Sequence, residues 1–281
     1  HSPALYPIYG LALGFLSITG MQYMMRCLRE SVKIRPLASQ ILGGLELTGK
    51  DRLTLINRLL ELNYDQEIQK DSGNICLTTA IRLCREQEDV RLVLNGVEEY
   101  LTKEISPSLR TMTLNAAFGL KTLVSSFSPN SQSRIAYNEF LRREIVQVES
   151  EVLHDNLQRQ IIEALAECDN MKELAPALFI QATSQLSSGR WSEFDYLVAH
   201  ATEYVSPALV NSMLAYAKTG TFEGGNPVYG DKNCDNQVVF SRRRRQELLH
   251  NLSSAYTQLP PSEQQALRLQ MISLYNRLED D

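Results

Sequence analysis

Four consecutive arginines form the strongest candidate for a binding site in this sequence. They follow Ser241 and open an amphipathic segment: Arg242, Arg243, Arg244 and Arg245. Cations at a helix N-terminus oppose the macrodipole and one another, so this position favours a role outside folding. In a chain of net charge −5, such a run could attract an acidic protein partner, a phosphate or a nucleic acid. Because successive helical residues turn by about 100°, the four side chains do not share one face, which argues against a specific nucleic-acid groove.

The only tryptophan, Trp191, is the second candidate for partner binding. Its neighbours recur at helical spacing and predict one buried stripe: Phe194, Leu197, Ala201 and Tyr204. The stripe indicates a core role for Trp191. The alternative is a partly exposed anchor in a protein interface, a position in which tryptophan is common.

Two segments match the spacing of ligand-binding loops but lack a necessary residue. Residues 44–50 have the spacing of a phosphate-binding loop, yet Asp51 occupies the position of the magnesium-binding hydroxyl and no strand precedes the segment. We therefore interpret it as a glycine turn before a helix capped by Thr48. Residues 231–236 resemble the first half of a calcium loop, but Arg242 stands where a glutamate ligand is needed.

No other pattern predicts catalysis, a metal or a cofactor. The four histidines have no metal-ligand spacing to one another or to a cysteine: His1, His154, His200 and His250. Carboxylate pairs such as Glu193 and Asp195 lie two residues apart and so do not face each other on a helix. The sequence favours a non-catalytic chain without cofactors. An enzyme whose site assembles from residues distant in sequence stays open.

The elements that would position these residues are amphipathic helices. Three serine–proline pairs predict helix starts, namely Ser106-Pro107, Ser128-Pro129 and Ser206-Pro207. The first is followed by a stripe at helical spacing, expected to face the core: Leu109, Met112, Ala116, Leu120, Leu123 and Phe127. Residues 130–168 predict one long helix or two helices with a break near 154–156.

The fold class predicted is all-α, an irregular array of about twelve antiparallel helices in helical-hairpin or HEAT-like stacking. Only two short strand candidates occur, at 74–78 and 237–240. We expect three parts: an N-terminal helical subdomain (1–105), a central array (106–218), and a glycine-rich loop with a C-terminal helical pair (219–281). Loops as long as the one near 219–237 are typically functional or disordered.

The N-terminus and the cysteines bear on location. Residues 8–25 carry no charge, which predicts a buried apolar helix; membrane contact is the less favoured alternative, because glycines and polar residues interrupt the segment. Five dispersed cysteines indicate reduced core residues, hence an intracellular, cytoplasmic protein. No signal peptide is visible, and secretion by a signal-independent route stays open.

One stretch resembles a known family. The pattern from Trp191 to Pro207, followed by Phe240-Ser241 and by residues 246–249, is similar to the C-terminal domain of type III secretion gatekeeper proteins. The resemblance covers under a quarter of the chain, and the loop at 220–237 departs from it. It implies a regulator of export that is built from three helical bundles and binds chaperones and the secretion apparatus. From the residues themselves, we expect a protein-interaction or regulatory scaffold with an acidic protein partner.

Overall fold

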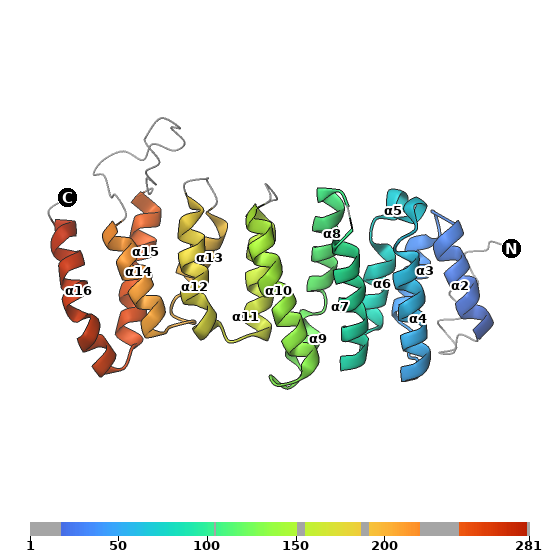
Figure 1. The fold of residues 1–281 in the computed structure, drawn as a ribbon, viewed down its shortest axis with the longest axis horizontal. Coiled ribbons are helices and arrows are strands. Elements are labelled where there is room, and N and C mark those ends of the chain that lie inside the picture. The colour runs from blue at the N-terminus through green and yellow to red at the C-terminus, as the bar shows by residue number, and fades with distance from the viewer. Residues whose placement is uncertain (1–17, 104, 151–154, 187–190, 220–241, 280–281) are drawn as a thin grey trace, which may run out of the picture. The chain divides into compact units, whose positions relative to one another are not determined.

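The computed structural model describes residues 18–103, 105–150, 155–186, 191–219 and 242–279. These ranges contain helices and no strands, and well over half of the 281 residues lie in helices, which confirms the all-α prediction (Figure 1). The contacts divide the chain into two compact units, His1–Leu153 and His154–Asp281. The three parts expected from the sequence stay a prediction; α7 and α8, on either side of residue 105, pack together within unit 1.

Unit 1 contains helices α2 to α10. Their bounds are α2 Ile18–Glu30, α3 Arg35–Gly43, α4 Gly49–Leu62, α5 Gln66–Ser72, α6 Ile75–Leu83, α7 Gln87–Leu101, α8 Pro107–Phe118, α9 Lys121–Ser125 and α10 Gln132–Ser150. Helices α3, α6 and α8 pack successively in one layer, and α4, α7 and α10 pack successively in a second layer. Contacts of α4 and α7 with α6 join the layers, and α2 packs on α3.

Unit 2 contains α11 Asp155–Cys168, α12 Met171–Ser184, α13 Ser192–Ala199, α14 Pro207–Thr219, α15 Arg242–Gln258 and α16 Pro261–Glu279. Its helices stack in two series. In the first, α11 packs on α13 and α13 packs on α15; in the second, α12 packs on α14 and α14 packs on α16. The pairs α12–α13 and α14–α15 also pack directly. This repeated pairing is the HEAT-like stacking predicted from the helix spacing.

Two of the three predicted serine caps are present. The Oγ of Ser106 accepts a hydrogen bond from the N–H of Leu109 at 3.3 Å, and the Oγ of Ser206 accepts one from Leu209 at 3.2 Å. The third cap is shifted, because Ser131 rather than Ser128 accepts from the first turn of α10, through the N–H of Arg134. Helices α10 and α11 are separate, as the second of the two alternatives for residues 130–168 required.

Two expectations about local structure are wrong. Residues 74–78, a strand candidate, instead start α6, because Cys76, Leu77, Ala80 and Leu83 form one buried helical face. The stripe beginning at Leu109 is also wrong within α8, where Met112 is 43% exposed and the buried residues include Leu114, Ala117 and Phe118. Its later member Leu120 is buried as expected, together with Val124. The chain turns at Gly119, whose N–H binds the carbonyl of Ala116, so the face that reaches the core changes between α8 and α9. The strand candidate at 237–240 lies outside the described residues.

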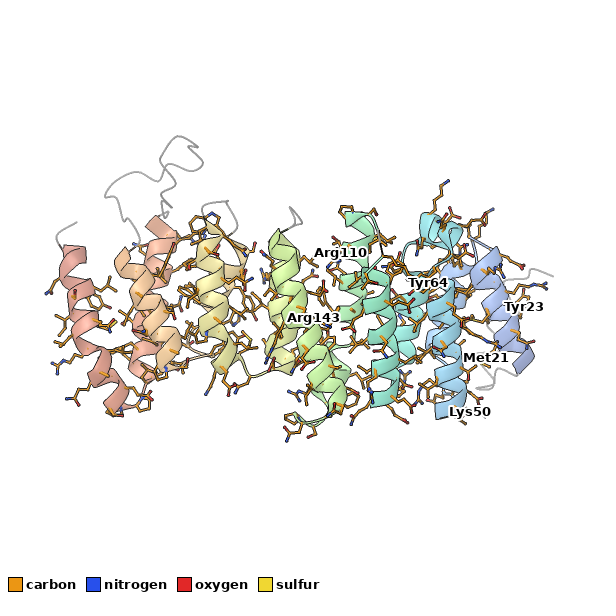
Figure 2. The ribbon with its side chains drawn as sticks, in the orientation of Figure 1. Met21, Tyr23, Lys50, Tyr64, Arg110 and Arg143 are labelled. Atoms are coloured by element: carbon orange, nitrogen blue, oxygen red, sulfur yellow. The ribbon has the colours of Figure 1, made fainter. Side chains whose placement is uncertain are left out.

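Buried ion pairs connect the helices of unit 1. Arg52 of α4 is 6% exposed and donates through Nε to Oδ2 of Asp89 of α7 at 2.8 Å. Arg110 of α8 donates to Glu144 of α10 at 2.7 Å, and both side chains are largely buried (Figure 2). Because an uncompensated buried charge is costly, each pair fixes the relative position of two helices.

The described cysteines and α2 bear on the remaining expectations. Cys27, Cys76, Cys84 and Cys168 are free and buried, whereas Cys234 lies outside the described residues. Helix α2 covers the second half of the charge-free segment and buries Met24, while Tyr23 is 43% exposed. Within the ranges given above, no helix combines the length and the apolar character needed to span a membrane.

Candidate functional site

Arg244, one of the predicted partner-binding residues, is held inside unit 2. Its Nε lies 3.0 Å and 3.1 Å from the two carboxylate oxygens of Asp195, and its Nη2 lies 2.9 Å from Oδ2. The centre of its guanidinium lies 4.2 Å from the ring centroid of Trp191, within cation–π range. These contacts connect the start of α15 to the start of α13. The side chain of Arg244 therefore helps to hold the unit together.

The other arginines of the run occupy different surroundings. Arg243 donates to Glu247 on its own helix at 2.9 Å, and its side chain is 87% exposed. Arg242 and Arg245 lie in the first turn of α15, and their side chains are outside the described part. The structure thus places Arg243 and Arg244 in separate environments, as expected for successive residues of a helix.

Trp191 immediately precedes α13 and is half-buried. Its ring meets Phe194 edge-on, with ring centroids 6.1 Å apart, while Arg244 covers it. Trp191 thus packs against unit 2 with part of its ring, as the core interpretation expects, and its role as a partner anchor stays a prediction.

The two ligand-loop matches give no site within the described chain. The segment 44–50 connects α3 to α4, so a helix and not a strand precedes it. Thr48 stands at the N-terminus of α4, where its hydroxyl donates to Asp51 at 2.7 Å. The calcium-like segment at 231–236 and the glycine-rich loop lie outside the described residues. Among the residues that are described, no group of three or more His, Cys, Asp or Glu side chains is placed to hold a metal.

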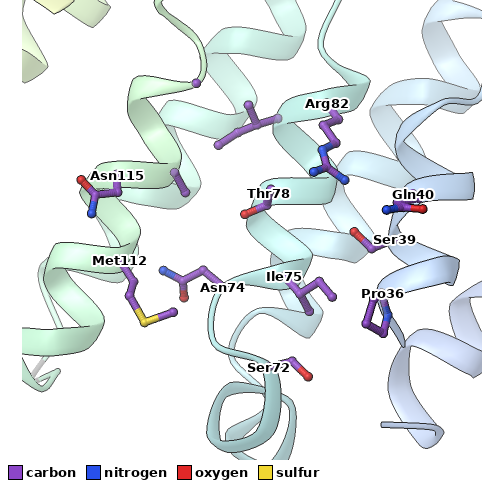
Figure 3. Close-up of a pocket in the computed structure, with 13 residues that line it drawn as sticks. Pro36, Ser39, Gln40, Ser72, Asn74, Ile75, Thr78, Arg82, Met112 and Asn115 are labelled. Atoms are coloured by element: carbon purple, nitrogen blue, oxygen red, sulfur yellow. The ribbon is translucent and has the colours of Figure 1, made fainter. Parts of the chain in front are cut away.

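A groove in unit 1 that the sequence did not reveal is the best candidate for a binding site. It has a cavity volume of about 740 Å³ and crosses the layer of α3, α6 and α8. Figure 3 shows α3 residues on one side, α8 residues on the other, and α6 between them. Its lining is Pro36, Ser39, Gln40, Ser72, Asn74, Ile75, Thr78, Ile81, Arg82, Met112, Asn115, Ala116 and Gly119.

The lining of this groove has an unusual charge balance for an acidic chain. It contains no Asp or Glu, and Arg82 is its one charged residue. The guanidinium of Arg82 is exposed and makes no ion pair or hydrogen bond with any described residue. The amides of Gln40 and Asn115 stand on opposite walls, so the groove offers donors and acceptors on both sides (Figure 3).

The turn before α6 builds one end of the groove. Gly73 has φ of +53°, and a Cβ added there would lie 2.2 Å from Cε of Met112. The next residue, Asn74, is 5% exposed and donates through Nδ2 to Oγ1 of Thr113 at 2.8 Å. Its Oδ1 accepts no hydrogen bond from the described residues. The bond from Nδ2 to Thr113 ties the start of α6 to α8 at this end of the groove.

A second cavity, between α2 and α4, is less suited to a specific ligand. It has a volume of about 750 Å³, and its lining mixes both signs of charge: Arg26, Arg29 and Arg58 with Glu30, Glu61 and Asp65. Arg26 already pairs with Glu30 at 3.4 Å. Because cations and carboxylates alternate around it, the cavity presents no dominant charge to a partner.

Comparison with known proteins adds no family or relative, since no family model, no curated protein and no solved structure matches the chain. The resemblance to type III secretion gatekeepers therefore stays a prediction.

The groove could not be predicted from the sequence because its residues come from three helices that are far apart in the chain. The residues from each helix alone have the composition of an ordinary exposed helix face.

Proposed function

We propose that this chain is a non-catalytic protein-interaction module, and that the groove across α3, α6 and α8 binds an extended segment of a partner protein. The observation that carries the proposal is the groove itself. Its volume of about 740 Å³ falls in the usual range for ligand sites. It runs across three stacked helices, and stacked helical arrays commonly bind partners on such layer surfaces.

The chemistry of the lining fits a polypeptide. An extended segment carries unpaired backbone N–H and C=O groups, which must find partners when they leave water. Amide side chains such as Gln40 and Asn115 both donate and accept, so they can pair with either group. Met112 adds a flexible apolar contact, a property that suits surfaces which accept varied side chains.

The same lining does not favour catalysis. Its hydroxyl groups have no histidine or carboxylate beside them in the groove to act as a base. Ser39, for example, shares a hydrogen bond of 2.6 Å with the hydroxyl of Thr79 and so has a structural partner. The module would act as a scaffold or regulator through binding alone. The four free, buried cysteines of the described residues support a reducing, cytoplasmic location for it.

A displayed library of random peptides tests this proposal. The full chain is immobilised and panned, and recovered peptides are retested against Met112→Trp, which fills part of the groove without adding a charge. The matched control is Ile135→Trp on α10, because Ile135 is 38% exposed and Met112 is 43% exposed in the same unit. We expect binders that Met112→Trp loses and Ile135→Trp retains. Recovery of no binders, or of binders that both variants retain, would refute the groove as a peptide site.

A further inference from the structure

We infer that the groove selects segments that carry a carboxylate, and that Arg82 is the residue that determines this specificity. The inference rests on the proposed function, because it names the chemistry of the segment that occupies the same groove. Two observations support it: the position of the Arg82 side chain and the charge balance of the lining.

The side chain of Arg82 is held at its stem and open at its tip. A Cβ added to Gly43 would lie 3.0 Å from Cβ and 3.1 Å from Cδ of Arg82, so the stem packs against the end of α3 where only glycine leaves room. The guanidinium beyond it makes no ion pair or hydrogen bond with any described residue. Fixing the stem in advance lowers the entropy lost on binding. A guanidinium with its donors unused matches the two oxygens of a carboxylate.

The charge balance selects the sign of the ligand. Since the lining contains Arg82 and no carboxylate, a basic side chain would find repulsion and no counter-ion there. An acidic side chain or a chain-terminal carboxylate would find one cation and several neutral donors. The net charge of −5 implies that such a local site stands out from the rest of the surface.

A purely structural role for Arg82 makes a different prediction. Its stem lies at the C-terminus of α3, where a cation interacts favourably with the helix dipole. If that were its main role, Arg82→Gln would lower the melting temperature of the protein and leave the choice of peptide unchanged. Peptide selectivity therefore distinguishes the two roles, and thermal melts of each variant show whether the fold is intact.

The experiment pans the same random peptide library on the full-length wild type, Arg82→Gln, Arg82→Lys and Arg82→Glu. The matched control is Arg91→Gln, because Arg91 is also exposed and makes no contact of this kind with described residues. We expect Asp, Glu or the free C-terminus to be enriched about five-fold at one position in the wild-type pool, as one solvated ion pair allows. Arg91→Gln should keep the enrichment, Arg82→Lys should keep only part of it because an ammonium lacks the two-point match to a carboxylate, Arg82→Gln should lose it, and Arg82→Glu should replace it with Lys or Arg.

Two outcomes would overturn the inference. In one, groove-dependent peptides show no acidic preference, which would leave the proposed function intact. In the other, the acidic preference survives in Arg82→Gln and does not reverse in Arg82→Glu, which would assign it to another residue. A failure of the proposed function itself looks different, since then no peptide depends on Met112.

Discussion

The buried pair of Arg52 and Asp89 gives the sharpest test of what holds unit 1 together. Asp89 is 1% exposed, and its Oδ2 accepts from Nε of Arg52 at 2.8 Å and from the backbone N–H groups of Arg85 at 2.8 Å and Glu86 at 2.9 Å. The carboxylate therefore caps the start of α7 and anchors it to α4. Asp89→Ala removes both functions with one substitution.

The expected cost follows from what remains after the substitution. Arg52 stays 6% exposed and loses its buried counter-ion, and breaking such a pair typically costs about 3–5 kcal/mol. Glu86, 67% exposed, still lies 3.1 Å from Nη2 of Arg52 and partly compensates. We therefore expect the low end, about 3 kcal/mol, for Asp89→Ala. Asp89→Asn keeps an acceptor oxygen but loses the charge, which should cost about 1.5 kcal/mol.

Urea unfolding monitored by far-ultraviolet circular dichroism measures these changes. The fluorescence of Trp191, the one tryptophan of the sequence, serves as a reference for unit 2. The double variant Arg52→Met/Asp89→Ala removes the stranded charge, so we expect it to be no less stable than Asp89→Ala alone. A cost below about 1 kcal/mol for Asp89→Ala, or equal costs for the Ala and Asn variants, would refute the role assigned to the pair.

Three further predictions concern other parts of the chain. Arg244→Gln should lower the free energy of unfolding of unit 2 by about 1 kcal/mol, because the side chain loses its contacts with the Asp195 carboxylate and the Trp191 ring. Arg243→Gln should change the free energy of unfolding little. Equal effects of the two substitutions in chemical melts would contradict this. Burial raises the pKa of Cys76 and of Cys84 to about 12, so these thiols should react with a disulfide reagent at neutral pH only in denaturant. Rapid labelling of the folded chain would contradict this expectation. Because both thiols ionise at lower pH in the unfolded chain than in the folded chain, the free energy of unfolding should fall as pH rises from 9 toward 12. Gly73→Ala should destabilise unit 1 by about 1–3 kcal/mol in a urea titration, since its φ is +53°, and an unchanged midpoint would show that the turn tolerates a side chain.

The sequence alone determined the helical class and several helix starts. The caps at Ser106 and Ser206 follow from side-chain oxygens that satisfy free N–H groups within three residues, which is local chemistry. The glycine turn before α4 could likewise be predicted from the sequence, because Asp51 argues against a phosphate-binding loop there. Periodicity also gave a wrong result within α8, where the stripe from Leu109 was assigned to the wrong face, although its later member Leu120 is buried as expected. The turn at Gly119 changes which side of the chain meets the core.

Only the tertiary structure decided how residues distant in the chain meet. Arg52 and Asp89 are 37 residues apart, and Arg244 and Asp195 are 49 residues apart, so no spacing rule connects them. The groove was hidden for the same reason, because α3, α6 and α8 each supply a few polar side chains that look solvated until the helices are stacked. Helix formation and the apolar face of a helix depend on residues within a few turns, so periodicity predicted the buried stripe of Phe194, Leu197, Ala201 and Tyr204. Charge pairing and cavities depend on which helices pack together, which periodicity does not encode.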